Sequence, residues 1–341
     1  MTTSTARSAA AVRTGLVAAL AAAVAVGSYG YFSAASNGGS APGGSTATGP
    51  AAPGNGETTS GVAPFTTADA GSCLTWDIAA DGTVSSFQQT DCAGEHRFEV
   101  SARENLATYP SSEFGENAPI PDLTRQAQLR EELCLNPTLR YLGGQFDPVG
   151  RYSIAPILPP AEAWAAGDRT MLCGLQSTDM GGIPMLTAGA AADQDQAVVA
   201  QPGTCLFVDE SRSLRTVDCA EDHQLETTLV VDLAPVFPEG VPSVEDQDNH
   251  LRDVCTDAAI DYLGEEENLY QSTLQPYWGT LQEASWVGGS RSVNCSLVFA
   301  DEEGGFATLN GTARDSRDGF TINGEPPAER PERNPLREPA E

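Results

Sequence analysis

An internal repeat built around eight cysteines constrains the fold of this 341-residue chain more than any other feature. Four cysteines recur in each copy, spaced by 19, 42 and 39 residues in the first copy and by 14, 36 and 40 in the second. A sequence that recurs at this length is one folding unit used twice, so the architecture has to be built copy by copy. The cysteines are Cys73, Cys92, Cys134 and Cys173, then Cys205, Cys219, Cys255 and Cys295.

The residues that flank the cysteines recur as well. Both copies have Gly-Ser/Thr-Cys-Leu at the first cysteine and Asp-Cys-Ala at the second, and Tyr-Leu-Gly follows the third. We predict two tandem domains over residues 65–192 and 203–314, joined by a linker at 193–202. The shared residues outside the cysteines include His96, Glu99 and Trp164 in the first copy, and His223, Glu226 and Trp286 in the second.

The second copy contains a clear helix signal. Apolar residues from Leu251 to Tyr262 fall on one helical face, and Cys255 belongs to that face. Ser243 can cap the N-terminus with its hydroxyl, and Gly264 can adopt the left-handed conformation at the C-terminus. We therefore predict a helix between these two residues that turns Cys255 toward a sheet.

Strand signals complete an α+β pattern in each copy. Residues 225–231 are apolar and β-branched, and residues 290–299 and 169–175 place the last cysteine of each copy on a strand. Pro137 stands three residues after Cys134 and is expected to break or kink the first copy's helix. The predicted fold class is α+β, with two tandem disulfide-stapled repeats, each a small, mostly antiparallel sheet with a packed helix.

The start of the chain indicates export. Arg7 and Arg13 precede an uncharged apolar run, which orients the N-terminus toward the cytoplasm. The apolar core at 16–27 suits a signal peptide, and Ser-Ala-Ala at 33–35 would suit cleavage. The longer run at 12–32 would also span a bilayer. Residues 1–36 are therefore either an anchor or a cleaved signal, and the remainder is expected outside the cell membrane, tethered or secreted.

Low-complexity sequence flanks the repeats. Residues 37–64 are rich in Gly, Ser and Pro, which cannot bury enough apolar surface to offset the entropy of ordering, so a flexible linker is expected. Residues 315–341 end in Pro, Glu and Arg and are expected to form a disordered tail.

Export and an even number of cysteines indicate disulfide bonds. Four cysteines allow three pairings per copy. The first two cysteines lie on neighbouring strand-like segments, and the third lies on a helix face opposite the strand of the fourth. Among the alternatives we predict the pairs Cys73–Cys92, Cys134–Cys173, Cys205–Cys219 and Cys255–Cys295.

The acidic balance of the chain excludes some partners. Lys plus Arg number 18 against 47 Asp plus Glu, a formal net charge of −29, and all 18 basic residues are arginine. Nucleic-acid binding needs basic clusters to neutralise phosphates, and adsorption to anionic lipid needs polybasic segments. We therefore expect no nucleic-acid partner, and membrane contact only through the N-terminal segment.

The histidines invite catalytic or metal hypotheses. The spacing of Cys92 to His96, repeated at Cys219 to His223, could suggest zinc, but zinc takes four ligands and the cysteines are needed for bridges. A bridged sulfur is also not a thiolate nucleophile. We predict no metal, no cofactor and no catalytic residue here.

The recurring His-x2-Glu pairs could be acid–base pairs. On a strand, however, residues three apart face opposite sides. We expect His96 and His223 to stabilise turns through backbone hydrogen bonds, and Glu99 and Glu226 to lie on the surface. His250 has no counterpart and is expected to be solvated.

Other chemistry is weakly signalled. The acidic runs at 245–248 and 265–267 lack the spaced ligands and glycine of a calcium loop. Gly-x-Ser-x-Gly, phosphate-loop and His-Glu-x-x-His motifs are absent from the sequence. A carboxylate pair for glycoside cleavage stays open, because the separation of its members is spatial.

Each copy resembles the septum formation domain of actinobacterial exported proteins. The resemblance rests on DCAGEHRFEV at 91–100, CTDAAIDYLG at 255–264 and LNGTARD at 309–315. Its most specific piece is Trp164-Ala-Ala-Gly167-Asp168-Arg169; the second copy departs there, with no Asp before Arg291. The resemblance implies a membrane-tethered protein whose motif residues are structural and whose family has no established catalytic residues.

Two functions compete on this basis. The first is a non-enzymatic envelope module that binds partners of the division or wall-synthesis machinery. The second is a wall-active hydrolase or an extracytoplasmic ligand-binding sensor. An enzyme should keep a convergent polar set in at least one copy, whereas Cys, Trp, Gly and a His near a turn are what recur. We therefore favour the first.

Overall fold

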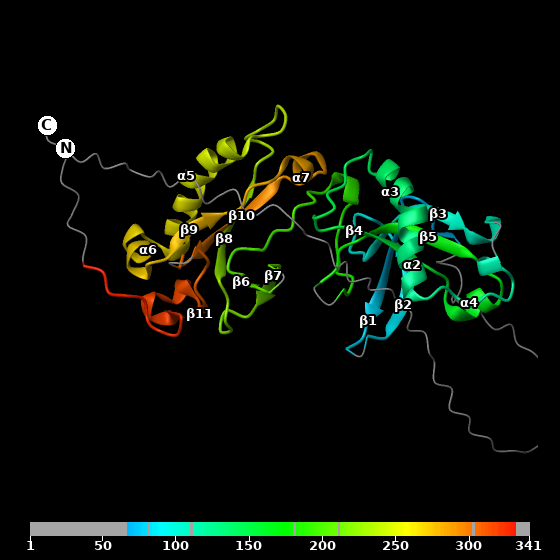
Figure 1. Cartoon of the computed structure of the whole chain (residues 1–341), viewed down its shortest axis with the longest axis horizontal. Coiled ribbons are helices and arrows are strands. Elements are labelled where there is room, and N and C mark those ends of the chain that lie inside the picture. The colour runs from blue at the N-terminus through cyan, green and yellow to red at the C-terminus, as the bar shows by residue number, and fades with distance from the viewer. Residues whose placement is uncertain are drawn as a thin grey trace, which may run out of the picture.

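The two sequence repeats form two copies of one arrangement in the computed structural model (Figure 1). The structure describes residues 67–331, apart from 81, 110–111, 180–181, 211 and 302–303. Each repeat contains a five-stranded antiparallel sheet, in the order β2-β1-β3-β5-β4 in repeat 1 and β7-β6-β8-β10-β9 in repeat 2. The orders correspond strand for strand, which confirms the α+β class and the tandem repeat.

Two of the four cysteines of each repeat lie on strands: Cys73 and Cys173 in repeat 1, and Cys205 and Cys295 in repeat 2. Edge strands β4 and β9 each contain a proline, Pro156 and Pro276, and proline is tolerated in sheets mainly at such edges. Repeat 1 contains β1 (Cys73–Ile78), β2 (Val84–Thr90), β3 (Phe98–Asn105), β4 (Ser153–Ile157) and β5 (Thr170–Gln176). Repeat 2 contains β6 (Cys205–Val208), β7 (Leu214–Val217), β8 (Leu225–Asp232), β9 (Gln275–Trp278) and β10 (Ser292–Val298).

The helix predicted in repeat 2 is α5 (Val244–Leu263), with the expected caps. The Ser243 hydroxyl accepts a hydrogen bond from the Asp246 amide at 3.1 Å, and Gly264 ends the helix with φ of 93°. The shorter helices of this repeat are α6 (Glu266–Ser272), α7 (Glu283–Val287), η5 (Ala313–Asp315) and η6 (Arg317–Gly319).

In repeat 1 the equivalent helical run is irregular, as Pro137 suggested. It proceeds as α2 (Leu123–Leu129), a π-helical turn η3 (Arg130–Cys134) and α3 (Leu135–Tyr141). Proline lacks the amide that an α-helix needs four residues beyond each carbonyl, so the ladder is re-phased just before it and the helical run continues. The remaining helices are α4 (Ala161–Ala165), η1 (Leu106–Thr108), η2 (Ser112–Phe114) and η4 (Ala191–Asp193).

Each core lies between the long helical segment and its sheet, and a disulfide crosses it. In repeat 1, Leu129, Trp164 and Met171 bury against the Cys134–Cys173 bridge. In repeat 2, Leu251 and Trp286 bury in the same way around Cys255–Cys295. Removal of such side chains from water is the main favourable term in folding.

The structure corrects the expected start of a disordered tail at residue 315. Strands β11 (Leu309–Gly311) and β12 (Phe320–Ile322) pair with each other, and Phe320 and Ile322 are buried in repeat 2. The physical reason is a tertiary contact. Phe320 and Ile322 pack in one hydrophobic cluster with Ala259 of α5 and Leu297 of β10.

The predicted anchor or signal at residues 1–36 and the linker at 37–64 lie outside the described residues. Among the residues that the structure does describe, no helix is both long and apolar enough to span a bilayer. His250 is half-buried, contrary to the solvated position expected, because its ring packs edge-on against Phe237.

Candidate functional site

The four disulfides join the predicted cysteines. They are Cys73–Cys92, Cys134–Cys173, Cys205–Cys219 and Cys255–Cys295, with Cα–Cα distances of 5.1–5.2 Å. The first bridge of each repeat holds the start of β1 or β6 to the turn after the next strand. The second bridge joins the long helical segment to the sheet, η3 to β5 in repeat 1 and α5 to β10 in repeat 2.

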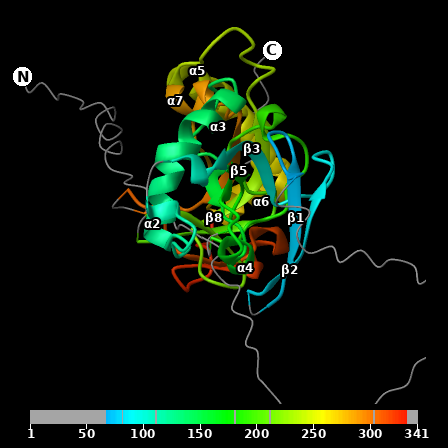
Figure 2. The same cartoon turned by 90° about the vertical axis from the view of Figure 1, so that its right-hand side faces the viewer.

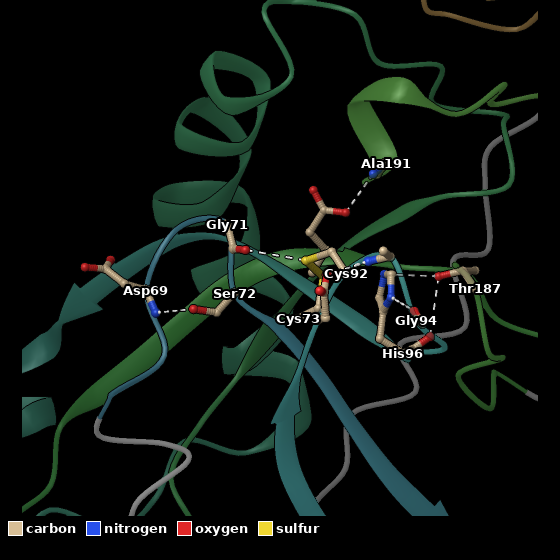
Figure 3. The surroundings of a disulfide bond; sticks show 12 residues. Asp69, Gly71, Ser72, Cys73, Cys92, Gly94, His96, Thr187 and Ala191 are labelled. Carbon is tan, nitrogen blue, oxygen red and sulfur yellow. Dashed lines mark hydrogen bonds between the residues drawn. A yellow bond between two sulfur atoms is a disulfide. The ribbon is translucent and has the colours of Figure 1, made fainter. Parts of the chain in front are cut away.

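Beside the Cys73–Cys92 bridge lies a polar group of His96, Glu99, Tyr141 and the Ala191 amide, which we call the Glu99 cluster. Figure 3 shows the bridge with His96 and Ala191 near it. The His96 Nδ1 donates to the carbonyl of Gly94 at 2.9 Å, as expected for a turn-stabilising histidine. Glu99 accepts from the Tyr141 hydroxyl at 2.6 Å through one oxygen and from the Ala191 amide at 2.7 Å through the other. Glu99 is 2% exposed.

Repeat 2 reproduces this arrangement in the Glu226 cluster. His223 Nδ1 donates to a backbone carbonyl at 2.9 Å. Glu226 accepts from the Tyr262 hydroxyl at 2.6 Å and, on the same oxygen, from the Thr312 hydroxyl at 2.5 Å. Its other oxygen accepts from the Ala313 amide at 2.8 Å. The Thr312 contact has no equivalent in the Glu99 cluster, where alanine stands at that position.

The expectations of a surface glutamate and of non-convergent His and Glu side chains are therefore wrong. Strands β3 and β8 begin only at Phe98 and Leu225, so each histidine precedes its strand and sits in an isolated bridge instead. The alternation rule for strands does not apply across that boundary. As a result, candidate ligand atoms of Cys73, His96 and Glu99 lie within 4.8 Å of one another, and those of the equivalent residues in repeat 2 do too.

The chemistry of these groups fits a framework better than a metal centre. The sulfurs are disulfide-bonded, so they offer no thiolate, and both oxygens of each glutamate accept strong hydrogen bonds. Burial, and next the hydrogen bond to the glutamate, raises the pKa of Tyr141 and of Tyr262 above the usual value. The tyrosines therefore stay protonated as donors to the carboxylates.

The backbone segment that each glutamate holds also recurs in the two repeats, although the sequence analysis identified it only in the second. Residues 187–193 (TAGAAAD) match 309–315 (LNGTARD), each with Gly-x-Ala-x-Asp. Gly189 and Gly311 both adopt positive φ and donate to the carbonyls of Cys92 and Cys219 at 2.7 Å. The Gly-x-Ala-x-Asp spacing was the signal that could have found the first copy of this closing segment.

A tryptophan–arginine pair also recurs in both repeats. Arg169 lies over the Trp164 ring at 4.1 Å, and Arg291 lies over the Trp286 ring at 4.5 Å. Trp164 is 3% exposed and Trp286 is 7% exposed, as expected for core anchors. Arg169 also donates to five backbone carbonyls, among them those of Trp164 and Phe114.

The departure of the second copy before Arg291 is explained by a contact between the repeats. Asp168 of repeat 1 accepts from the Thr170 amide, whereas its counterpart Ser290 donates to the carboxylate of Asp147 in repeat 1 at 2.6 Å. Both Ser290 and Asp147 are buried. Gly288 faces the same loop so closely that a Cβ there would lie 2.7 Å from the Asp147 Cα.

The segment between the repeats seals this junction. Gln196 is 3% exposed; its side chain accepts from the Asp147 amide and donates to the Gln145 carbonyl, both at 2.9 Å. Asp195 accepts from the Arg291 amide at 2.8 Å. Polar groups from three segments are thus satisfied by one another, and the repeats lie in a row (Figures 1 and 2).

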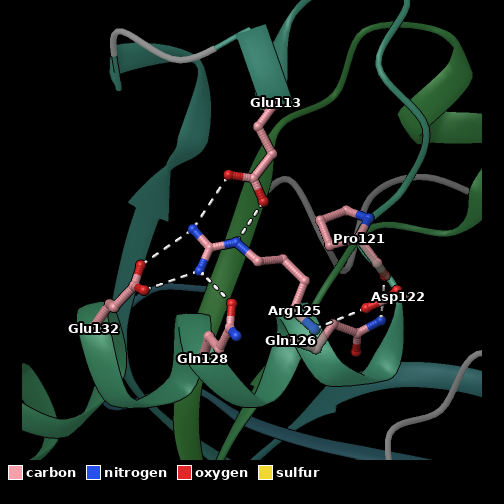
Figure 4. Close-up of polar contacts among 7 residues, drawn as sticks. All are labelled: Glu113, Pro121, Asp122, Arg125, Gln126, Gln128 and Glu132. Carbon is pink, nitrogen blue, oxygen red and sulfur yellow. Dashed lines mark hydrogen bonds and ion pairs between the residues drawn. The ribbon is translucent and has the colours of Figure 1, made fainter.

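One surface ion-pair network is specific to repeat 1 (Figure 4). Arg125 on α2 contacts Glu113 of η2 at 2.5 Å and Glu132 of η3 at 2.9 Å, and also donates to Gln128. Hydrogen bonding to Arg125 lowers the pKa of Glu132. The network ties η2 to the irregular helical run, and all its charges are satisfied within the protein.

Comparison with known proteins gives consistent results. A family model described as Septum formation matches residues 70–295, a range that contains all eight cysteines. Uncharacterized membrane proteins from two strains of Mycobacterium tuberculosis, CDC 1551 / Oshkosh and ATCC 25618 / H37Rv, are each 39% identical over 274 residues. The alignment covers 79% of this chain and 60% of the length of each relative, so the chain matches only part of those proteins.

No solved structure matches this chain significantly. The family match extends over more than half of the chain and includes Glu99, Glu226, Trp164 and Trp286. This chain therefore belongs to the septum formation family.

Proposed function

We propose that this protein is a membrane-tethered, non-enzymatic module of the cell envelope that binds protein partners in cell division or wall synthesis. Its N-terminal segment would provide the attachment, in keeping with the membrane proteins of Mycobacterium tuberculosis to which it is similar. The family's description as Septum formation supports the association with division. A secreted form would follow if the segment were cleaved.

The proposal rests on one observation: the polar residues that recur in both repeats make contacts within the fold. In both repeats one oxygen of the glutamate accepts from a tyrosine hydroxyl and the other from a backbone amide, and the cysteines are bridged. A general base or a nucleophile needs a lone pair or thiolate within reach of substrate. The residues that the repeats share serve the fold instead, which supports a binding role.

The junction between the repeats supports binding by the pair as one body. Two buried hydrogen bonds, from the Ser290 hydroxyl to the Asp147 carboxylate and from the Asp147 amide to the Gln196 side-chain oxygen, fix one repeat against the other. A partner can therefore meet a preorganised surface made from both repeats, which lowers the ordering cost of association.

The net charge of the protein and the length of its linker limit the kinds of partner that it can bind. With a net charge of −29 the protein should be repelled by acidic wall polymers, which favours protein partners or contacts made through cations. The composition of residues 37–64 is that of a linker with a random-coil reach of roughly 30 Å. The folded pair would then operate in the membrane-proximal wall.

A combined imaging and cross-linking experiment tests the proposal. A fluorescent fusion to the full chain should concentrate at division sites, and cross-linking in the same cells should recover envelope proteins of division or wall synthesis. Uniform peripheral fluorescence in dividing cells, with normal septa after deletion of the gene, would contradict the division role.

The non-enzymatic part has its own test. Purified protein is expected to show no hydrolysis of peptidoglycan or of ester and amide substrates. Robust turnover that disappears when one carboxylate is changed would overturn it and favour a wall-active hydrolase.

A further inference from the structure

A bulge at equivalent positions of the two sheets has different surroundings in each repeat. Pairing of β3 with β5 skips Ser101, and pairing of β8 with β10 skips Thr228. In repeat 1 the Ser101 hydroxyl is hydrogen-bonded to the Thr138 hydroxyl of α3 at 2.6 Å. In repeat 2 the residue equivalent to Thr138 is Ala259, which has no hydroxyl to offer.

The Thr228 hydroxyl is buried, and because Ala259 offers no hydroxyl it has no hydrogen-bond partner among the described residues. Thr228 itself is 6% exposed. An unmade hydrogen bond at a buried polar group is costly, so native proteins rarely leave one without a use. The position therefore suggests a ligand that supplies the missing partner.

Thr228 lines an open groove of about 500 Å³ between α5 and β8. Two substitutions relative to repeat 1 fit such an opening: Ala258 stands where repeat 1 has Pro137, and Asp261 stands where it has Arg140. The apolar part of the lining includes Leu229 and Val254.

Charges of opposite sign line the same groove. Asp257 and Asp261 are exposed one turn apart on α5, and Arg314 of η5 lies over the Tyr262 ring at 4.7 Å. None of the salt bridges in the described part of the chain involves these two aspartates or this arginine. A cation alone would be repelled by Arg314, and an anion alone by the aspartates.

We propose that this groove binds a small zwitterion of the amino-acid class. The ligand's ammonium would lie between Asp257 and Asp261, and its carboxylate would pair with the Arg314 guanidinium, a geometry that suits a carboxylate well. A short aliphatic side chain would cover Leu229, and the ligand would offer a hydrogen bond to Thr228. This site goes beyond partner binding and does not depend on a role in division.

Binding of leucine to the full chain in detergent, measured by ligand-observed NMR, tests the proposal. Leucine is expected to bind saturably, whereas leucinamide, which lacks the carboxylate, and N-acetylleucine, which lacks the ammonium, should each bind three- to tenfold more weakly. Arg314→Gln should remove the preference for leucine over leucinamide. The paired change Asp257→Asn with Asp261→Asn should remove the preference over N-acetylleucine.

A substitution that recreates the repeat 1 contact provides the sharpest variant. Ala259→Thr gives the Thr228 hydroxyl an internal partner and should weaken leucine binding about fivefold, with the fold checked by circular dichroism. Its matched control is Thr138→Ala in repeat 1, which should leave leucine binding unchanged. Absence of saturable leucine binding, or equal binding of leucine and leucinamide by the unaltered protein, would overturn the proposal.

Discussion

Replacing Tyr141 by phenylalanine removes one of the two hydrogen bonds that hold the buried Glu99 carboxylate. The hydroxyl lies 2.6 Å from one carboxylate oxygen, and only the Ala191 amide, on the other oxygen, remains. A hydrogen bond to a charged group contributes about 1.5–3 kcal/mol, and Glu99 is too deeply buried for water to replace it readily. We therefore expect Tyr141→Phe to lower the free energy of unfolding by about 2 kcal/mol.

The matched substitution in repeat 2 should cost less. Glu226 keeps the Thr312 hydroxyl on the oxygen that Tyr262 contacts. Tyr262→Phe should therefore cost about 1 kcal/mol, and adding Thr312→Ala should cost more than the sum of the two single changes, since the two donors share one acceptor.

Differential scanning calorimetry of the full chain would measure these losses, because a kcal/mol shifts the midpoint of a domain of this size by roughly 3–5 °C. Urea titration at 25 °C gives an independent value. Equal losses at the two tyrosines, or a loss below about 0.5 kcal/mol for Tyr141→Phe, would refute the reasoning that these hydroxyls satisfy buried carboxylates.

Three further outcomes follow from the same framework. Truncating Trp164 or Trp286 to alanine should cost about 3–5 kcal/mol and unfold its own repeat first, seen as a separated calorimetric transition. The raised pKa of both cluster tyrosines means that the folded state holds these protons more tightly, so stability is full below about pH 10 and declines as the pH rises further, less so when both are phenylalanine. Gly288→Ala should separate the repeats and raise the radius of gyration in X-ray scattering, whereas Gly279→Ala, with open space around its Cβ, should not.

Local sequence signals were sufficient to predict the helix of repeat 2 and the pairing of the cysteines. Helix α5 was predicted from the Ser243 cap, the apolar face and Gly264, and it forms with both caps in place. The disulfide pairing followed from placing each cysteine on a strand or a helix face. In these cases neighbouring residues determine the backbone, so that tertiary contacts agree with local preference.

Non-local contacts account for the parts that sequence reasoning missed. Strand β12 is only three residues long, and its burial depends on β11 and α5, which no local pattern reveals. The convergence of His96 with Glu99 depends on where β3 begins, and a shift of two residues decides it. The contact between Ser290 and Asp147 joins residues 143 apart in the chain, so the departure from the family motif could be seen but not explained.

Septal enrichment of full-length fluorescent fusions carrying Glu99→Gln or Glu226→Gln tests the central claim most directly. It should be measured in dividing cells alongside the folded fraction of each variant at the growth temperature. If the clusters are framework and the folded pair binds partners, enrichment will fall only in proportion to the folded fraction. A variant that remains fully folded and yet loses its enrichment at septa would contradict the account, because the carboxylate would then have a role beyond holding the fold.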